Sequence, residues 1–233
     1  MKKERVLITG GASGIGQACA QRCVAEGYDV VVIDLHGDGL RADLSDRAQT
    51  ARALDQALEA GPITRLINNV GVVLPANAQD QTLDELEKVW SLNVRCAMQS
   101  MQALLPGMKE AGFGRIVNMS SRAALGKELR SAYSATKAAL LGMMRVWALE
   151  LGQYGITVNA IGPGPIRTEL FNSANPPDSP RTRAIVQGIP VRRMGEPQDV
   201  AQAAAFFLDE RSGFVTGQVL YVCGGMTVGV AAV

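Results

Sequence analysis

Apolar positions in this chain form short β-rich runs that alternate with longer segments of helical periodicity. Such alternation is typical of strands that are buried on both faces by the helices connecting them. The runs predict strands at 5–9, 30–34, 64–68, 115–119, 156–161 and 218–222. The periodic segments predict helices at 15–26, 46–60, 83–108, 133–154 and 197–208. We therefore expect an α/β fold, a single Rossmann-like doubly wound domain over 1–233 with a central, mostly seven-stranded parallel sheet flanked by helices.

Two stretches depart from this alternation. The connection at 35–42 is too short for a crossover helix, which with its loops usually takes about a dozen residues, so we expect a short loop there. The segment between Thr168 and Arg193 contains Pro176, Pro177, Pro180 and Pro190 and shows neither a strand nor a regular helical pattern. Long irregular segments inside compact domains are often lids or binding loops. We predict that residues 169–193 form a mobile lid over a substrate.

The composition excludes several classes of protein. Of the 233 residues, 47% are hydrophobic and 19% are charged, and a net charge of +1 gives no global attraction to nucleic acid or to an anionic membrane. No apolar run is long enough for a membrane span, and the first residues lack a signal-peptide pattern, so we expect a cytoplasmic protein. The cysteines form no Cys-x-x-Cys pair and His36 is the only histidine, so we expect reduced core thiols and no metal site.

A glycine-rich turn follows the first predicted strand, with the sequence Thr9-Gly-Gly-Ala-Ser-Gly-Ile-Gly16. Glycines let the chain turn tightly and bring backbone N–H groups close to a pyrophosphate at the start of a helix. A glycine cluster alone is weak evidence, but its position between the first strand and the first helix is specific. The residues predicted to bind a dinucleotide here are Gly10, Ser13, Gly14, Ile15 and Gly16.

Asp34 ends the second predicted strand, where the adenosine ribose of a dinucleotide would lie. A carboxylate there accepts hydrogen bonds from the ribose hydroxyls and repels a 2′-phosphate, so the position favours NAD over NADP. Leu35 follows it, and no arginine or lysine comes directly after it. Further along, Asp43 and Leu44 fit a segment that contacts adenine.

Tyr133 and Lys137 lie four residues apart in a predicted helix and therefore share one face. A free tyrosine has a pKa near 10, and making it half ionised at pH 7 requires about 3 units, or about 4 kcal/mol. A lysine ammonium one turn away, together with a cationic nicotinamide ring, is a plausible source of that stabilisation. Alone, such a pair is usually structural.

Taken together, these motifs resemble the short-chain dehydrogenase/reductase family over essentially the whole chain. The resemblance rests on the glycine-rich turn and on Asn68-Asn69-Val70-Gly71, Asn93, Ser120-Ser121, Tyr133-x-x-x-Lys137 and Pro163-Gly164-Pro165-Ile166-Arg167-Thr168. It implies that Tyr133 is the acid/base, that the serine hydrogen-bonds the substrate oxygen, that Lys137 binds the ribose and lowers the tyrosine pKa, and that Asn93 holds a water in a proton relay. It also implies that Ile166 and Thr168 meet the nicotinamide carboxamide. The further cofactor contacts implied by the resemblance are Asn69, Val70, Gly71, Tyr133, Lys137, Pro163 and Gly164.

Three features depart from the family pattern. Val70 replaces the usual alanine, which is expected to tighten packing near the adenosine, and Cys223 replaces an aspartate before Gly224 and Gly225. The third concerns the catalytic serine, because the usual spacing to the tyrosine selects Ser120 whereas the strand register selects Ser121. Strand side chains alternate between faces, and the following loop can absorb a deletion more easily than the strand. We therefore predict Ser121.

These observations predict an NAD-dependent alcohol dehydrogenase or carbonyl reductase that transfers a hydride between NAD(H) and a secondary alcohol or ketone. The alternatives are an NADPH-dependent 3-oxoacyl-type ketoreductase of the same family and a dinucleotide-sensing protein without chemistry. The substrate is not identified. Five cations, Arg122, Lys127, Arg130, Arg181 and Arg183, could meet a carboxylate, but we expect solvated loop charges.

A homo-oligomer, a tetramer or a dimer, is expected without nucleic-acid or membrane partners. The family tendency supports it, and so do three apolar segments. The predicted helices 83–108 and 133–154 are too apolar for surface helices with a single buried face, and the tail 227–233 is apolar as well.

Overall fold

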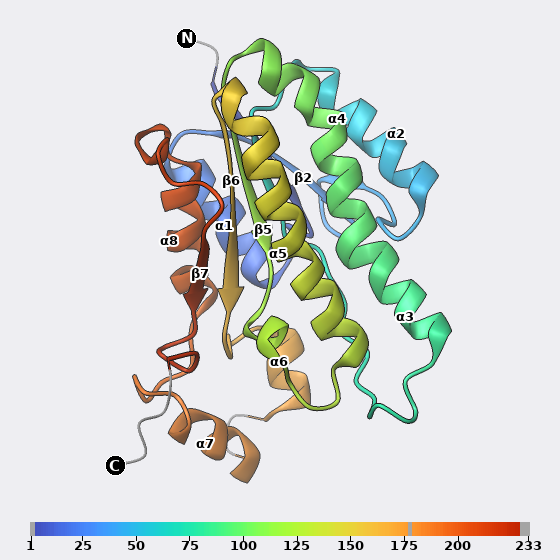
Figure 1. Ribbon diagram of the computed structural model, residues 1–233, viewed down its shortest axis with the longest axis vertical. Helices are drawn as coiled ribbons and strands as arrows, with labels where there is room; N and C mark the ends of the chain where they lie inside the picture. The colour runs from blue at the N-terminus through green and yellow to red at the C-terminus, as the bar shows by residue number, and fades with distance from the viewer. Residues whose placement is uncertain (1–2, 177–178, 229–233) are drawn as a thin grey trace.

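A seven-stranded parallel sheet in the order β3-β2-β1-β4-β5-β6-β7 runs through the centre of the protein (Figure 1). The computed structural model describes residues 3–176 and 179–228, without the side chains of Leu170 and Ala174. The strands are β1 Arg5–Thr9, β2 Asp29–Asp34, β3 Leu40–Arg41, β4 Arg65–Asn68, β5 Gly114–Met119, β6 Ile156–Pro163 and β7 Val219–Val222. The predicted fold class, including the parallel sheet, is confirmed.

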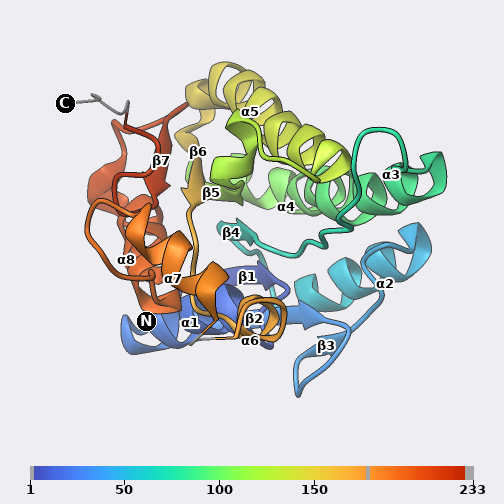
Figure 2. The same ribbon diagram turned by 90° about the horizontal axis from the view of Figure 1, so that it is seen from below.

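Helices cover both faces of this sheet (Figure 2). They are α1 Gly14–Ala25, α2 Arg47–Leu58, α3 Leu83–Trp90, α4 Cys96–Glu110, α5 Ser131–Leu151, α6 Glu169–Ala174, α7 Pro180–Gln187 and α8 Pro197–Leu208. Helices α2, α4 and α5 pack on one face, and α1 and α8 pack against each other on the opposite face. No described helix combines the length and apolar character that a membrane crossing needs.

Strand β1 shows how the sequence builds two cores at once. Successive side chains of a strand point to opposite faces of the sheet. Val6 and Ile8 accordingly lie in the core beneath α1 and α8, whereas Leu7 lies in the core beneath α2, α4 and α5. Because every residue of β1 is buried, the run has no polar alternation, as its sequence led us to expect.

The connection between β2 and β3 is a short loop, as predicted from its length. Residues 35–39 contain no helix, and β3 consists of two residues that pair in parallel with Ile33 and Asp34. Farther along, the helix predicted for 83–108 is divided by a π-helical turn at Ser91–Arg95. A π turn inserts an extra residue into the helical ladder, which hydrophobic periodicity alone does not reveal.

The expectation that 169–193 lacks regular helix was wrong, because this segment contains α6 and α7. Thr168 accepts a hydrogen bond from the N–H of Phe171 and so caps α6. Ser179 caps α7 in the same way, and Pro180 occupies its first turn. Proline is favoured at the start of a helix, since its missing N–H would have no partner there. One of the four prolines in this segment therefore begins a helix, while Pro177 lies outside the described residues.

Candidate active site

The predicted functional residues gather at the carboxyl end of the sheet, which faces the viewer in Figure 2. From β1 the chain adds β2 and β3 on one side of the sheet and then returns to add β4 on the other side of β1. The strand order therefore reverses between β1 and β4. In open α/β sheets, ligands bind at such a reversal, outside the carboxyl ends of the strands. The segment containing α6 and α7 lies across this end.

The glycine-rich turn between β1 and α1 has a shape that only glycine permits. Gly10 and Gly14 adopt φ angles of +68° and +54°, in the left-handed region. A Cβ on Gly16 would lie 2.0 Å from the carbonyl oxygen of Gly10. Ser13 precedes α1 in extended conformation without capping it through its side chain. The first N–H groups of α1 therefore remain for an anion, which fits the pyrophosphate of a dinucleotide.

Asn69 and Thr9 clamp this turn onto the end of β4. The Asn69 side-chain amide donates hydrogen bonds to the carbonyl oxygens of Thr9, at 3.1 Å, and Gly10, at 2.8 Å. In return, the Thr9 hydroxyl accepts from the backbone N–H groups of Asn69 and Val70. A Cβ on Gly10 would lie 2.9 Å from the Cα of Val70, so the residue that departs from the family pattern packs directly against the turn.

Asp34 joins the same structure from β2. One carboxylate oxygen accepts from the N–H of Ala12 at 3.0 Å and the other accepts from the N–H of His36 at 3.2 Å. The carboxylate thus lies against the glycine-rich turn, where a ribose hydroxyl could share it. Leu35 is half exposed beside it.

The other residues predicted at the adenine end are placed differently. The Asp43 carboxylate accepts from the N–H and the hydroxyl of Ser45. The Leu44 side chain is buried in the core. Only the backbone of Leu44 therefore remains for an adenine contact.

Tyr133 and Ser121 meet at the beginning of α5. Burial raises the pKa of the Tyr133 phenol, while a hydrogen bond with the Ser121 side chain and then the positive charge of Arg130 act to lower it. The Ser121 hydroxyl also accepts from the N–H of Ala123, which fixes its position. Ser120 points elsewhere, because its buried hydroxyl donates to the carbonyl oxygen of Lys137 at 2.7 Å. The structure therefore brings Ser121, and not Ser120, to the phenol.

Lys137 is buried one turn after Tyr133, with its ammonium 5.6 Å from the centre of the phenol ring. Its Nζ donates to the carbonyl oxygen of Met119, the last residue of β5, at 2.8 Å. Burial lowers the pKa of Lys137 to about 8. An ammonium has three donors, so this single described bond leaves capacity for the hydroxyls of a ribose.

Asn93 lies in the π turn and is buried beside Lys137. Its side-chain oxygen accepts from the N–H of Val72 at 2.8 Å, and its amide donates to the Val72 carbonyl and to the Thr136 hydroxyl. A Cβ on Gly71 would lie 3.1 Å from the Asn93 oxygen and 3.2 Å from the Lys137 Nζ. A glycine at position 71 thus leaves room for both groups, consistent with the predicted grouping.

The segment after β6 completes the site from the other side. Pro163 ends the strand, and a Cβ on Gly164 would lie 2.7 Å from the Cα of Cys223. The Ile166 side chain is buried, whereas the Thr168 methyl group lies against Gly14, 3.3 Å from where a Cβ would stand. Thr168 is therefore beside the glycine-rich turn, as a cofactor contact requires.

No disulfide joins any of the four cysteines. Cys19, Cys23, Cys96 and Cys223 are all free and buried, as predicted, and the described residues contain no cluster of side chains suited to a metal ion. Burial raises the pKa of Cys96 to about 12. Burial also acts to raise the pKa of Cys223, but hydrogen bonds with Thr227 and with backbone N–H groups outweigh it and lower that pKa.

The sequence did not reveal two partners in this site. Thr136 receives the Asn93 amide, and its position three residues after Tyr133, on the same side of the helix, was the available signal. The Met119 carbonyl that holds Lys137 carries no sequence signal, because it is a backbone group.

Comparison with known proteins adds four findings. A family model described as "Enoyl-(Acyl carrier protein) reductase" matches residues 10–227. The chain is 35% identical over 240 residues to "(2S)-[(R)-hydroxy(phenyl)methyl]succinyl-CoA dehydrogenase subunit BbsD" of Thauera aromatica, covering 95% of this chain and 96% of that protein. It is 33% identical over 250 residues to "L-2,3-butanediol dehydrogenase" of Corynebacterium glutamicum, covering 94% and 97%. A solved structure, a "blue fluorescent protein from metagenomic library in complex with NADPH", superposes with a TM-score of 0.88 at 33% identity and covers 97% of this chain and 98% of that one.

Proposed function

This chain belongs to the short-chain dehydrogenase/reductase family, and on that premise we propose that it transfers a hydride between NAD(H) and a secondary alcohol or ketone. The family consists of oxidoreductases that use a nicotinamide dinucleotide, and relatives named for alcohol or diol oxidation are among its members. One observation supports the proposal most directly. The Tyr133 phenol lies beside the Ser121 hydroxyl and the Lys137 ammonium at the carboxyl end of the sheet, and the lysine lies against Gly71.

The proposed roles follow from the chemistry of these groups. A bound nicotinamide would give or accept the hydride at the substrate carbon. Ser121 would donate to the substrate oxygen, and Tyr133 would move the proton at that oxygen. Because burial raises the Tyr133 pKa, the fold favours the neutral phenol, the form that donates a proton during carbonyl reduction. Lys137 would hold the ribose and place a positive charge near the phenol.

Activity with a panel of compounds tests this proposal. Secondary alcohols, diols, hydroxy acids and ketones would be offered with NAD⁺ or NADH, and the change in nicotinamide absorbance would be followed. We expect turnover with members of the panel that carry a secondary hydroxyl or a ketone. If NADH bound the protein but no member of a broad panel reacted, the dinucleotide-sensing alternative would replace the proposed enzyme.

We further propose that Asp34 makes the protein prefer NAD. The carboxylate lies where it would accept ribose hydroxyls and repel a 2′-phosphate. A relative that binds NADPH has the same fold, so the fold does not decide between the cofactors. Asp34→Asn is a sharp test, because the amide oxygen can still accept from Ala12 while the negative charge is lost. We expect the ratio of kcat/KM for NADH over NADPH to fall about 10-fold or more, and a wild-type preference for NADPH would instead favour the ketoreductase alternative.

We also propose that the segment 169–193, with its helices α6 and α7, is a lid over the site. It begins directly after Thr168, at the cofactor side of the site, and lies across the carboxyl end of the sheet. Closing over the site would exclude water from the hydride transfer. Amide hydrogen exchange at 169–193 should slow when NADH and a substrate analogue are both bound. Equal protection with and without them would contradict a lid.

A homo-oligomer also remains our proposal. Helix α5 exposes Val146 and Leu149, the latter with 85% of its surface accessible, and α3 exposes Leu83 and Trp90. Large apolar side chains exposed on helices are typical of surfaces that another subunit covers. Of the apolar tail 227–233, residues 229–233 lie outside the described residues. Sedimentation should give a dimer or tetramer, and a stable monomer at micromolar concentration would contradict this.

A further inference from the structure

Four positively charged side chains gather around the loop that leads into α5, and one of them, Arg130, acts on the Tyr133 phenol. Arg122, Lys127 and Arg130 come from the segment between β5 and α5, and Arg181 comes from the first turn of α7. Lys127 lies within electrostatic range of the other three. Arg122, Arg130 and Arg181 all act on Lys127, and Arg181 also acts on Arg130. Segments about 50 residues apart in the sequence thus bring positive charge to one place.

Arg130 occupies the position nearest the chemistry. It directly precedes α5, three residues before Tyr133, and its charge acts to lower the pKa of that phenol. The backbone around it is fixed, because Ala76 pairs with Arg130 in an isolated bridge and donates to the carbonyl oxygen of Leu129. Leu129 is held at φ +60°, a conformation that non-glycine residues rarely adopt. Such local strain is often found at functional sites.

No described carboxylate neutralises this cluster. Within residues 3–176 and 179–228, none of Arg122, Lys127, Arg130 and Arg181 makes an ion pair. Glu128 is next to Lys127 in the chain but is exposed and unpaired with it. Partial burial, together with the charges of the other three cations, lowers the pKa of Lys127. Because the other three cations oppose the charge of Lys127, an anion placed among them would be bound favourably.

We propose that the substrate carries an anionic group, a carboxylate or a phosphate, which Arg130 and Arg181 bind while Tyr133 acts on its hydroxyl or carbonyl. A guanidinium presents two parallel N–H donors that match both anions, and Lys127 and Arg122 add to the positive field. This inference rests on the proposed function and names the class of its substrate: hydroxy and keto acids, or hydroxy phosphates. It replaces the expectation that these are merely solvated loop charges.

Matched pairs of substrates test the proposal in the enzyme with its cofactor. Each pair consists of an anionic alcohol and its uncharged analogue, such as 3-hydroxybutanoate and its methyl ester. Further pairs vary the number of carbons between the hydroxyl and the anionic group. A second series uses hydroxyalkyl phosphates and so separates the two anions. We expect the anionic member to have a kcat/KM about 10- to 100-fold higher, since a hydrogen bond to a charged group contributes on that scale.

Variants assign the effect to the cluster. Arg130→Gln and Arg181→Gln should each remove most of the anionic advantage, mainly through KM, while turnover of the neutral analogue continues. Arg52→Gln, which removes one exposed charge from α2, is the matched control and should retain the advantage. Equal kcat/KM for the two members of every pair, or an advantage that survives in both site variants, would overturn the proposal.

A binding measurement separates failure of this inference from failure of the proposed function. If no compound were turned over, the proposed function would fall, and the anion site would be judged from thermal unfolding of the NADH complex. Acetate and phosphate would be compared with chloride at equal ionic strength, with NADH present so that the pyrophosphate site is filled. Stabilisation that is lost in the Arg130→Gln, Arg181→Gln double variant and kept in Arg52→Gln supports the site. Equal stabilisation of all three proteins, or none at all, overturns it.

Discussion

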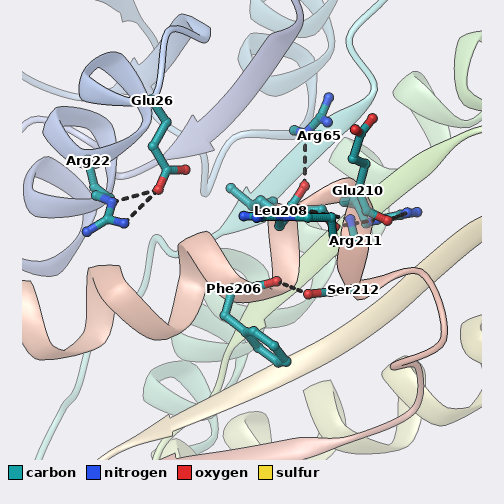
Figure 3. A network of polar contacts seen from close by, with 10 residues as sticks. Arg22, Glu26, Arg65, Phe206, Leu208, Glu210, Arg211 and Ser212 are labelled. Atoms are coloured by element: carbon teal, nitrogen blue, oxygen red, sulfur yellow. Dashed lines mark hydrogen bonds and ion pairs between the residues drawn. The ribbon is translucent and has the colours of Figure 1, made fainter.

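The two ends of the sheet both carry buried or half-buried cations, but they treat them in opposite ways. At the amino end, Arg65 donates to the Leu208 carbonyl at 3.0 Å (Figure 3). It also pairs with Glu4 at 2.7 Å. The rings of Tyr28 and Phe113 each lie 4.7 Å from its guanidinium. The neighbouring arginines at this end, Arg5 and Arg115, likewise donate to backbone carbonyls, and Arg5 also pairs with Asp29.

At the carboxyl end, the cations have few partners. Lys137 donates to a single described carbonyl, and Arg130 donates to the carbonyl of Leu129 and makes no described ion pair. The difference separates cations whose partners the fold supplies from cations that, as we propose, bind a ligand. A cation with its partners supplied by the fold stabilises the fold, whereas one without them is ready to bind something else.

The largest expected effect separates chemistry from stability at the carboxyl end. Tyr133→Phe should lower kcat about 100- to 10,000-fold, since we propose that the phenol supplies the proton. NADH binding and Tm should change little, because most of the cofactor site does not involve the hydroxyl. Steady-state kinetics, NADH titration and thermal unfolding measure the three quantities. Retention of more than about a tenth of the wild-type kcat would refute the acid/base role.

The opposite pattern is expected at the amino end. Arg65→Ala should lower the free energy of unfolding by about 2–4 kcal/mol, because it leaves a cavity between two aromatic rings and deprives the Leu208 carbonyl of its donor. The kcat should remain near wild type. Arg65→Met, which keeps much of the volume, should cost less. Arg211→Gln is the control, because this arginine is 85% exposed in its ion pair with Asp209, and its Tm should not move. A kcat loss in Arg65→Met at unchanged stability would break the distinction between the two ends.

The smallest effect is a gain of stability at the active site. The folded pKa of Lys137 is about 8, below the 10.5 expected when it is exposed, so the unfolded chain binds more protons between these values. Stability from this group therefore rises with pH from about 8 to about 10.5, and at pH 7 its full burial cost is present. Lys137→Met should raise the free energy of unfolding at pH 7 by about 1–3 kcal/mol while abolishing turnover. The gain should shrink at pH 10 in urea unfolding. A gain that is equal at both pH values would show that the charge is not its cause.

Local patterns predicted most of the framework, and partners distant in sequence explain most of what was missed. The strands, the glycine-rich turn and the placement of Ser121 toward Tyr133 follow from periodicity and register, which act over a few residues. The clamp between Asn69 and Thr9 joins groups 60 residues apart, so local sequence patterns do not predict this contact. The sequence does not predict α6 and α7, because residues that cap a helix, such as Thr168 and Ser179, are equally common in loops.

The arginines at the amino end show most clearly what the sequence does not predict. Arg65 finds a backbone carbonyl 143 residues along the chain. Every residue type carries a backbone carbonyl, so the sequence does not mark which one will accept the bond, and its position is defined only when the fold is complete. A charged residue at the start of an apolar run therefore gives no warning that it will be buried.

The short connection after β2 has a consequence for local opening of the sheet. With no crossover helix there, Val30, Val31 and Val32 of β2 are only half-buried, whereas all of β1 is buried. An edge with fewer apolar contacts opens at a lower free energy than the rest of the sheet. This edge carries Asp34, so a dinucleotide bound there, as we propose, would stabilise an edge of the sheet that the fold covers only partly. Cofactor affinity and the opening of this edge would then be linked.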